Sequence, residues 1–65
     1  MNLTALEMFQ IANAFSAASD LALNLEELSA KINPRQGSEI QQALRSAALS
    51  ADSAENMLRI ILSQN

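Results

Sequence analysis

The chain of 65 residues has no cysteine, no histidine, no tryptophan and no tyrosine, and only one proline and one glycine. Without cysteine there is no disulfide framework and no thiolate metal site, and without histidine a serine lacks its usual activating base. A single glycine excludes a glycine-rich phosphate-binding loop. The one adjacent acidic pair, Glu26-Glu27, does not converge on a ligand, because consecutive helical residues point in different directions. We therefore expect a protein that is not an enzyme and that uses no metal and no cofactor.

Positive charge is also scarce, since four basic residues stand against seven acidic ones and the net charge is −3. Proteins that bind nucleic acid or an anionic membrane displace counterions with clustered lysine and arginine. The basic residues here are spread along the chain: Lys31, Arg35, Arg45 and Arg59. The sequence opens with no basic segment followed by an apolar run, and it has no run long enough to span a membrane. We expect a cytoplasmic protein that binds no nucleic acid, no membrane and no small molecule.

The residues that are abundant favour helices. There are twelve alanines and ten leucines, but no valine and one threonine, so strand formers are almost missing. A chain of this length forms at most one small domain. The composition therefore predicts a single all-α domain.

A first helix is predicted over residues 5–32. Thr4 and Glu7 have the spacing of a capping box, and Leu3 and Met8 flank it at the positions of a hydrophobic staple. Apolar residues then recur every three or four positions, which places them on one face. This stripe contains Met8, Ile11, Phe15, Ala18, Ala22, Leu25, Ser29 and Ile32, and Leu21 and Leu28 widen it on one flank.

A turn over residues 33–38 and a second helix over 39–62 follow. Pro34 ends the first helix, Gly37 permits a positive φ, and Ser38 with Gln41 forms a second capping box. The seam of the second helix is predicted to contain Ile40, Leu44, Ala47, Ala51, Ala54, Leu58 and Ile61. Cap-like residues at 50–53 leave a kink or a short third helix open, although the unchanged phase of the seam favours a continuous helix.

The short connection predicts an antiparallel helical hairpin. Large residues of the first helix, such as Phe15 and Leu25, then face a second helix whose middle is alanine. This pattern indicates closely spaced helix axes, a feature of coiled-coil packing.

Each helix also carries a weaker apolar strip outside its seam. The two strips contain Phe9, Ala12, Ser16 and Leu23 on the first helix, and Leu49, Ser53 and Ile60 on the second. Isolated exposed hydrophobic residues need no explanation. The alternative is that both strips are buried against another chain, most simply in a homodimeric four-helix bundle. Phe9 is the predicted anchor, because aromatic residues dominate binding hot spots.

These features favour a small protein–protein interaction module, such as an adaptor, a co-chaperone or an inhibitor, whose partner is a second copy or another protein. A structural subunit of a larger helical assembly stays open, because subunits of secretion needles share the hairpin outline. A dimeric RNA-binding hairpin also shares this outline, but the acidic composition argues against it.

Overall fold

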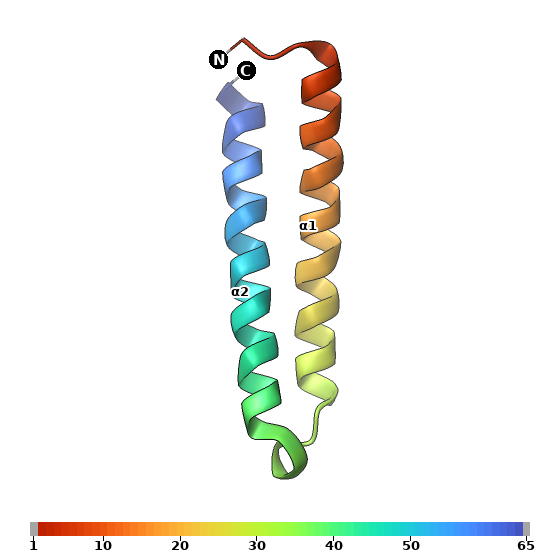
Figure 1. Cartoon of the computed structure of the whole chain (residues 1–65), viewed down its shortest axis with the longest axis vertical. Coiled ribbons are helices and arrows are strands. Elements are labelled where there is room, and N and C mark those ends of the chain that lie inside the picture. Colours follow the sequence, from red (N-terminus) through yellow and green to blue (C-terminus); the bar gives the residue numbers. More distant parts are fainter. Residues whose placement is uncertain (1, 65) are drawn as a thin grey trace.

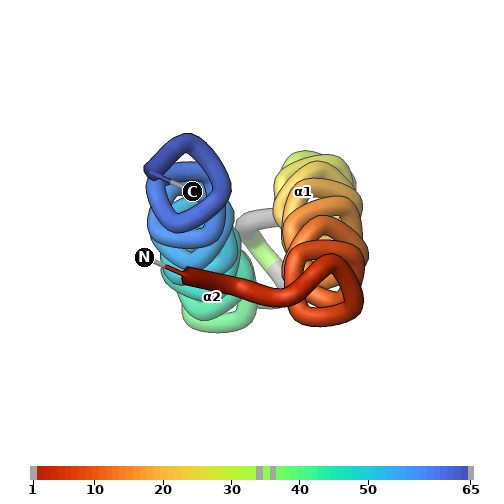
Figure 2. Tube along the Cα trace, turned by 90° about the horizontal axis from the view of Figure 1, so that it is seen from above, coloured from red at the N-terminus to blue at the C-terminus, as the bar shows by residue number. Residues whose placement is uncertain are grey.

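The computed structural model describes residues 2–64, and two antiparallel helices contain most of them. Helix α1 is Ala5–Lys31 and helix α2 is Pro34–Gln64, and no strand occurs between these limits (Figure 1). Seen end-on, the helices lie side by side (Figure 2). The Cα atoms extend over 50 × 14 × 11 Å, so the hairpin is one layer of two rods. The prediction of an all-α helical hairpin is confirmed.

Helix α1 begins where the sequence predicted. The amide of Glu7 donates to Thr4 Oγ1 over 3.1 Å, and the amide of Thr4 donates to Glu7 Oε1 over 2.9 Å. These two bonds satisfy amides that have no partner inside the helix. The hydrogen bonds from Thr4 lower the pKa of Glu7. Residues 2–4 cross the open end of the hairpin toward α2 (Figures 1 and 2), and Leu3 and Met8 are partly buried there.

The turn differs from the prediction. Asn33 caps α2, since its Oδ1 accepts the amide of Arg35 over 3.0 Å and its carbonyl accepts the amide of Gly37 over 3.1 Å. Pro34 takes the first helical position, where its missing amide costs nothing. Helix α2 therefore begins five residues before the predicted position 39, as one helical turn that precedes a kink at Gly37. The predicted capping box of Ser38 and Gln41 is wrong, because the side chain of Gln41 donates to the carbonyl of Ser29.

Gly37 supplies room at this kink, and it does not use positive φ. Its φ is −168°, which is extended backbone. A Cβ atom there would lie 3.3 Å from Ile40 Cδ1 and 3.6 Å from Ile32 Cγ2. Ile40 and Ile32 therefore lie close to Gly37, and a larger residue at this position would press against Ile40.

Helix α2 is continuous through residues 50–53, as the phase of the seam predicted. Asp52, within this segment, is partly buried. The helix ends at Gln64, two residues after the predicted end.

Replacing Thr4 by alanine tests the α1 cap. We expect Thr4→Ala to lower the free energy of unfolding by about 1 kcal/mol, because the cap hydroxyl is lost, while Thr4→Ser keeps most of the stability. The folded-state pKa of Glu7 is lowered, so its contribution is present above the ordinary glutamate pKa and is lost as the pH falls through the lowered value. Urea denaturation at pH 7 and in acid measures both effects. An equal loss for the serine and alanine variants would contradict the cap.

Candidate functional site

The face of α1 that packs on α2 is the predicted stripe. All eight of its residues are buried or partly buried: Met8, Ile11, Phe15, Ala18, Ala22, Leu25, Ser29 and Ile32. Leu21 and Leu28, which widen the stripe, stay about half exposed. The apolar periodicity therefore identified the inner face of this helix.

The inner face of α2 is rotated by one residue from the prediction. The predicted positions Leu44, Ala51 and Leu58 do face α1, and Ile61 is partly buried. The others are exposed: Ile40, Ala47 and Ala54. Their places in the inner face are taken by the residues that follow them, which are Gln41, Ala48 and Glu55, and Leu62 completes the row. The predicted seam is therefore wrong at these three positions.

A hydrogen bond between the helices holds this rotation. Gln41 Nε2 donates to the carbonyl oxygen of Ser29 over 2.9 Å. That carbonyl lies in the last turn of α1, where it has no helical partner. Because Gln41 must reach it, Gln41 faces inward and Ile40 turns to the side, against Gly37. Glu55 occupies an inner position of the same series, and Arg59 donates to Asn56 Oδ1.

The centre of the hairpin is made of alanine. Ala22, Ala48 and Ala51 are 4%, 3% and 7% exposed, and they are the buried apolar residues among those the structure describes. Among the side chains that the structure describes, no large one is completely buried. Small side chains let the helices approach closely, but they remove little apolar area from water. The inner faces alone therefore give a thin core.

The three α2 residues that were predicted to face inward but are exposed lie on one side of the hairpin, together with residues of α1. They are Ile40, Ala47 and Ala54. All of them immediately precede an inner position. The two antiparallel helices are related by an approximate twofold axis perpendicular to the plane that contains them both. Residues that precede an inner position on α1 therefore lie on the same side of the hairpin as residues that precede an inner position on α2. We call this side the front face, and it consists of Ala14, Leu21, Leu28, Ile40, Ala47, Ala54 and Ile61.

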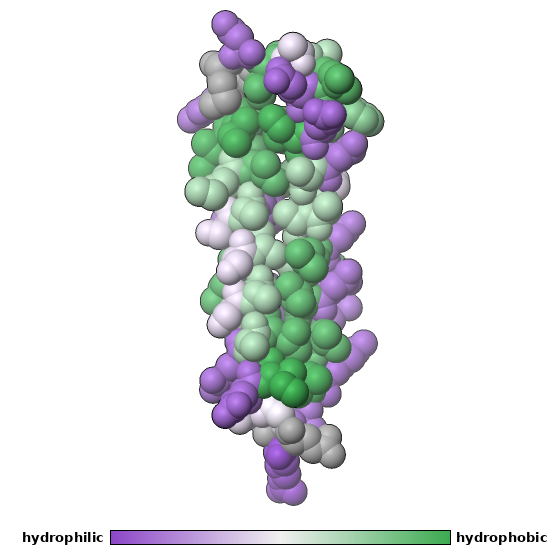
Figure 3. All heavy atoms as spheres, in the orientation of Figure 1, coloured by the Kyte–Doolittle hydropathy of each residue, from purple (hydrophilic) through white to green (hydrophobic). Residues whose placement is uncertain are grey.

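The front face is apolar along nearly the whole hairpin. Figure 3 shows apolar side chains running over both helices, with strongly hydrophilic residues at the outer edge of α1 and toward the ends, and pale residues of intermediate hydropathy along the outer edge of α2. Its large residues Leu21, Leu28 and Ile40 are 52%, 47% and 57% exposed. On the opposite side, α2 presents the charged residues Arg45 and Asp52. The two sides of the hairpin therefore differ in chemistry.

The two predicted strips are exposed, but they do not form one surface. Phe9, Ala12, Ser16 and Leu23 lie on the outer side of α1. The helical positions of Leu49, Ser53 and Ile60 place them on the outer side of α2, beyond its charged residues. The structure therefore leaves two separate narrow strips, whereas the front face joins both helices.

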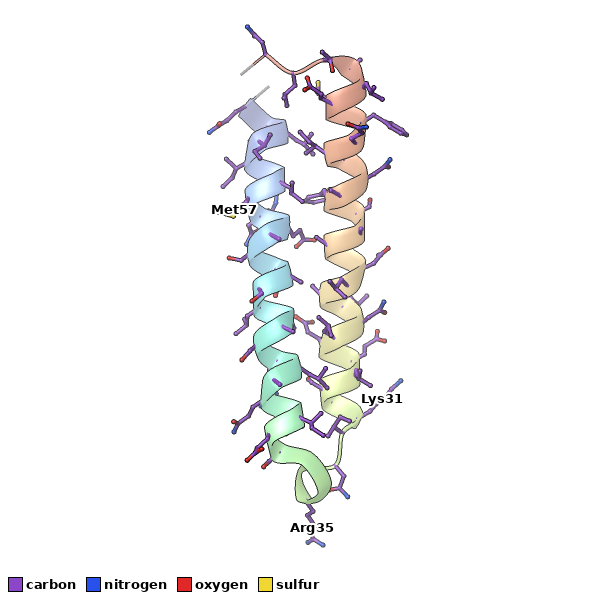
Figure 4. The ribbon with its side chains drawn as sticks, viewed as in Figure 1. Lys31, Arg35 and Met57 are labelled. Atoms are coloured by element: carbon purple, nitrogen blue, oxygen red, sulfur yellow. The ribbon has the colours of Figure 1, made fainter. Side chains whose placement is uncertain are left out.

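The labelled charged side chains do not converge on a common point where they could bind a ligand. Figure 4 shows Lys31 and Arg35 near the turn and Met57 on the outer side of α2, each pointing away from the hairpin. Within residues 2–64, no group of three acidic side chains lies close enough to hold a metal ion. None of the described helices combines the length and apolarity required to cross a bilayer.

Comparison with known proteins gave no match to a protein-family model, to a curated protein or to a solved structure.

Sequence reasoning missed the front face because it assigned four of its residues to the seam. A signal was present, since α2 has two parallel apolar columns, one through Ile40, Ala47 and Ala54 and another through Leu44, Ala51 and Leu58. One partner helix covers only part of a helix circumference. Together these two columns are wider than the strip of α2 that α1 can cover. The sequence therefore indicated that part of the apolar surface of α2 stays exposed.

The alanine centre predicts a sharp penalty for added volume. We expect Ala48→Leu to cost about 1–3 kcal/mol of unfolding free energy, because the helices must separate to admit it. The control is Gln42→Leu on the exposed side of the same helix, which should change stability by less than about 0.5 kcal/mol. Thermal unfolding followed by circular dichroism measures both. If Ala48→Leu is as stable as the parent chain, the helices are not closely packed there.

The bond between Gln41 and the Ser29 carbonyl predicts a second penalty. We expect Gln41→Ala to lower stability by about 1 kcal/mol, since it leaves a partly buried carbonyl without a donor. Gln42→Ala is the matched control, because its side chain is exposed. Urea denaturation of the two variants compares them directly, and equal midpoints would show that the bond does not anchor the turn.

Proposed function

We propose that the chain is a non-enzymatic protein–protein interaction module that acts by burying its front face against another polypeptide. The observation that supports this proposal is the continuity of that face. Single exposed hydrophobic residues are normal on a soluble surface, but a contiguous apolar surface is typical of an interaction site. Here Leu21, Leu28 and Ile40 are each about half exposed on one side of one small chain.

The shape of the front face suits recognition by helices. Its residues recur every seven positions on both helices, so the ridge they form is straight and parallel to the helix axes. A helix or helix pair that lies along this ridge contacts α1 and α2 together, as in recognition of helices by apolar grooves. An adaptor, a co-chaperone or an inhibitor would each use the face in this way.

A structural subunit of a filament is the second candidate, and one observation favours it. The outer strip of α1, with Phe9 64% exposed, is separate from the front face. Contact between two different surfaces of successive copies produces an open assembly. Nucleic-acid binding is not proposed, because Lys31 and Arg35 lie at the turn, apart from Arg45 and Arg59 farther along α2.

Affinity capture from cells that express the chain tests the proposal. The bait is used in three forms: the parent chain, Leu28→Glu on the front face, and Leu49→Glu on the outer side of α2. Both leucines are exposed, so both variants should keep the helical content of the parent. We expect a stoichiometric polypeptide, either a tagged second copy or another protein, to be retained by the parent and by Leu49→Glu and to be lost from Leu28→Glu.

Capture by itself does not support the proposal, since any apolar surface can retain proteins non-specifically. Dependence on Leu28 is the informative result. Equal capture by all three forms, or no stoichiometric partner on any of them, would contradict burial of the front face as the function of the chain.

A further inference from the structure

We propose that the front face is covered by a second copy of the chain, in a homodimer whose two hairpins stack face to face and antiparallel. In this arrangement the turn of one hairpin lies at the open end of the other, and α1 packs on α1 of the partner while α2 packs on α2. This inference rests on the proposed function, in which the front face is buried, and it specifies a second copy of the chain as the polypeptide that covers the face.

The accessible surface of the chain is larger than a compact protein of its mass would have. The chain has a mass of 7.0 kDa and exposes 4829 Å². A compact monomer of that mass exposes about 4,000 Å². The excess of about 800 Å² equals the area that one partner contributes to an interface of standard size. Burial of one long face of the hairpin therefore brings the chain to the surface area of an ordinary folded protein.

The front face of α2 is symmetric along its length. Ile40, Ala47, Ala54 and Ile61 read large, small, small, large in either direction. A twofold axis that crosses α2 midway between Ala47 and Ala54 pairs Ile40 with the partner's Ile61, and Ala47 with the partner's Ala54. A second copy thus meets the same pattern of sizes that it presents, which is the requirement for an isologous interface.

The front face of α1 does not read the same in both directions, since Ala14, Leu21 and Leu28 are small, large and large, but it is complementary to itself about Leu21. An axis through Leu21 sets that leucine against the partner's Leu21, and it sets Ala14 against the partner's Leu28, a small residue against a large one. Such pairs fill space evenly, as cores require. Glu7, the next position in the series, then falls beyond the overlap, so no charge is buried without a partner.

One axis satisfies both helices. The bond between Ser29 and Gln41 places these two residues at nearly the same height in the hairpin. Eight residues farther from the turn, Leu21 of α1 is therefore level with Leu49 of α2. The axis required by α2 crosses between residues 50 and 51, which differs from Leu49 by about 2–3 Å of helix rise. The axis about which the α2 row is symmetric therefore lies close to the level of Leu21, the middle residue of the α1 row.

Parallel stacking fits these residues less well. With both turns at one end, Leu28 and Ile40 of both chains crowd one layer of the bundle, while Ala14 and Ala54 of both chains leave another layer underfilled. Uneven layers combine overpacking with cavities, and each is destabilising. The antiparallel arrangement distributes the same residues over three layers of similar volume.

Light scattering of the purified chain tests the dimer. We expect the parent chain to have the mass of two copies, and Leu21→Glu to be a monomer, because the substitution places two carboxylates against each other at the axis. The control is Leu23→Glu on the outer side of α1, which should remain a dimer. Leu21 and Leu23 are 52% and 55% exposed within one chain, so circular dichroism should show both variants folded. A monomeric parent, or a mass that grows with concentration beyond two copies, would overturn the proposal.

Cross-linking tests the orientation, since the natural chain contains no cysteine. We expect Leu21→Cys to form a covalent dimer on mild oxidation, because the two copies of this residue meet at the axis, and Leu23→Cys to form none. In a parallel dimer the two α1 helices lie at diagonally opposite corners of the four-helix bundle, so the two copies of residue 21 are too far apart to cross-link. A dimer by mass in which the cysteine at position 21 does not cross-link would therefore contradict the antiparallel arrangement.

The dimer and the proposed function fail in different ways. A purified chain that is monomeric, yet captures another protein through Leu28, would overturn the homodimer and leave the interaction function standing. A purified chain whose mass is insensitive to Leu21→Glu would instead overturn the assignment of the front face to a second copy, whatever the chain binds in cells.

Discussion

The close contact of alanines at the centre of the hairpin is the constraint on which the rest of the structure depends. Ala22, Ala48 and Ala51 are nearly inaccessible, so the two helices approach closely over the middle of their length. One neighbouring helix covers only a strip of each helix, and alanines within that strip bury little apolar area. Every apolar residue outside that strip must remain on the surface or be covered by something else, and this is why so small a chain exposes so many large apolar side chains.

The turn decides which apolar residues are left outside. Asn33 starts α2 before the kink at Gly37, and Gln41 reaches the free carbonyl of Ser29. These local bonds set the rotation of α2 about its own axis. The rotation turns a polar residue inward and moves Ile40 to the side. A few hydrogen bonds at one end of the hairpin thus generate a continuous apolar face along its whole length.

Those parts of the fold that depend on local sequence were predictable. The cap formed by Thr4 and Glu7, the inner face of α1 and the continuity of α2 follow from residues close together in the chain. The rotation of α2 was not predictable, because the acceptor of Gln41 exists only where α1 ends. The apolar stripe of α2 is also broader than one helix can cover, so periodicity alone did not show which part faces inward. The candidate surface was therefore sought at Phe9 and Leu49, whereas the structure joins the two helices at the front face.

The central claim is that the thin core of one hairpin is completed by a second copy. Its most direct test is the dependence of the unfolding midpoint on protein concentration. When folding and dimerisation are coupled, mass action raises the midpoint as the chain concentration rises. We predict such a rise for the parent chain over a hundredfold range of concentration, and none for Leu21→Glu, whose midpoint should be lower throughout. A midpoint of the parent chain that does not move with concentration would contradict the account.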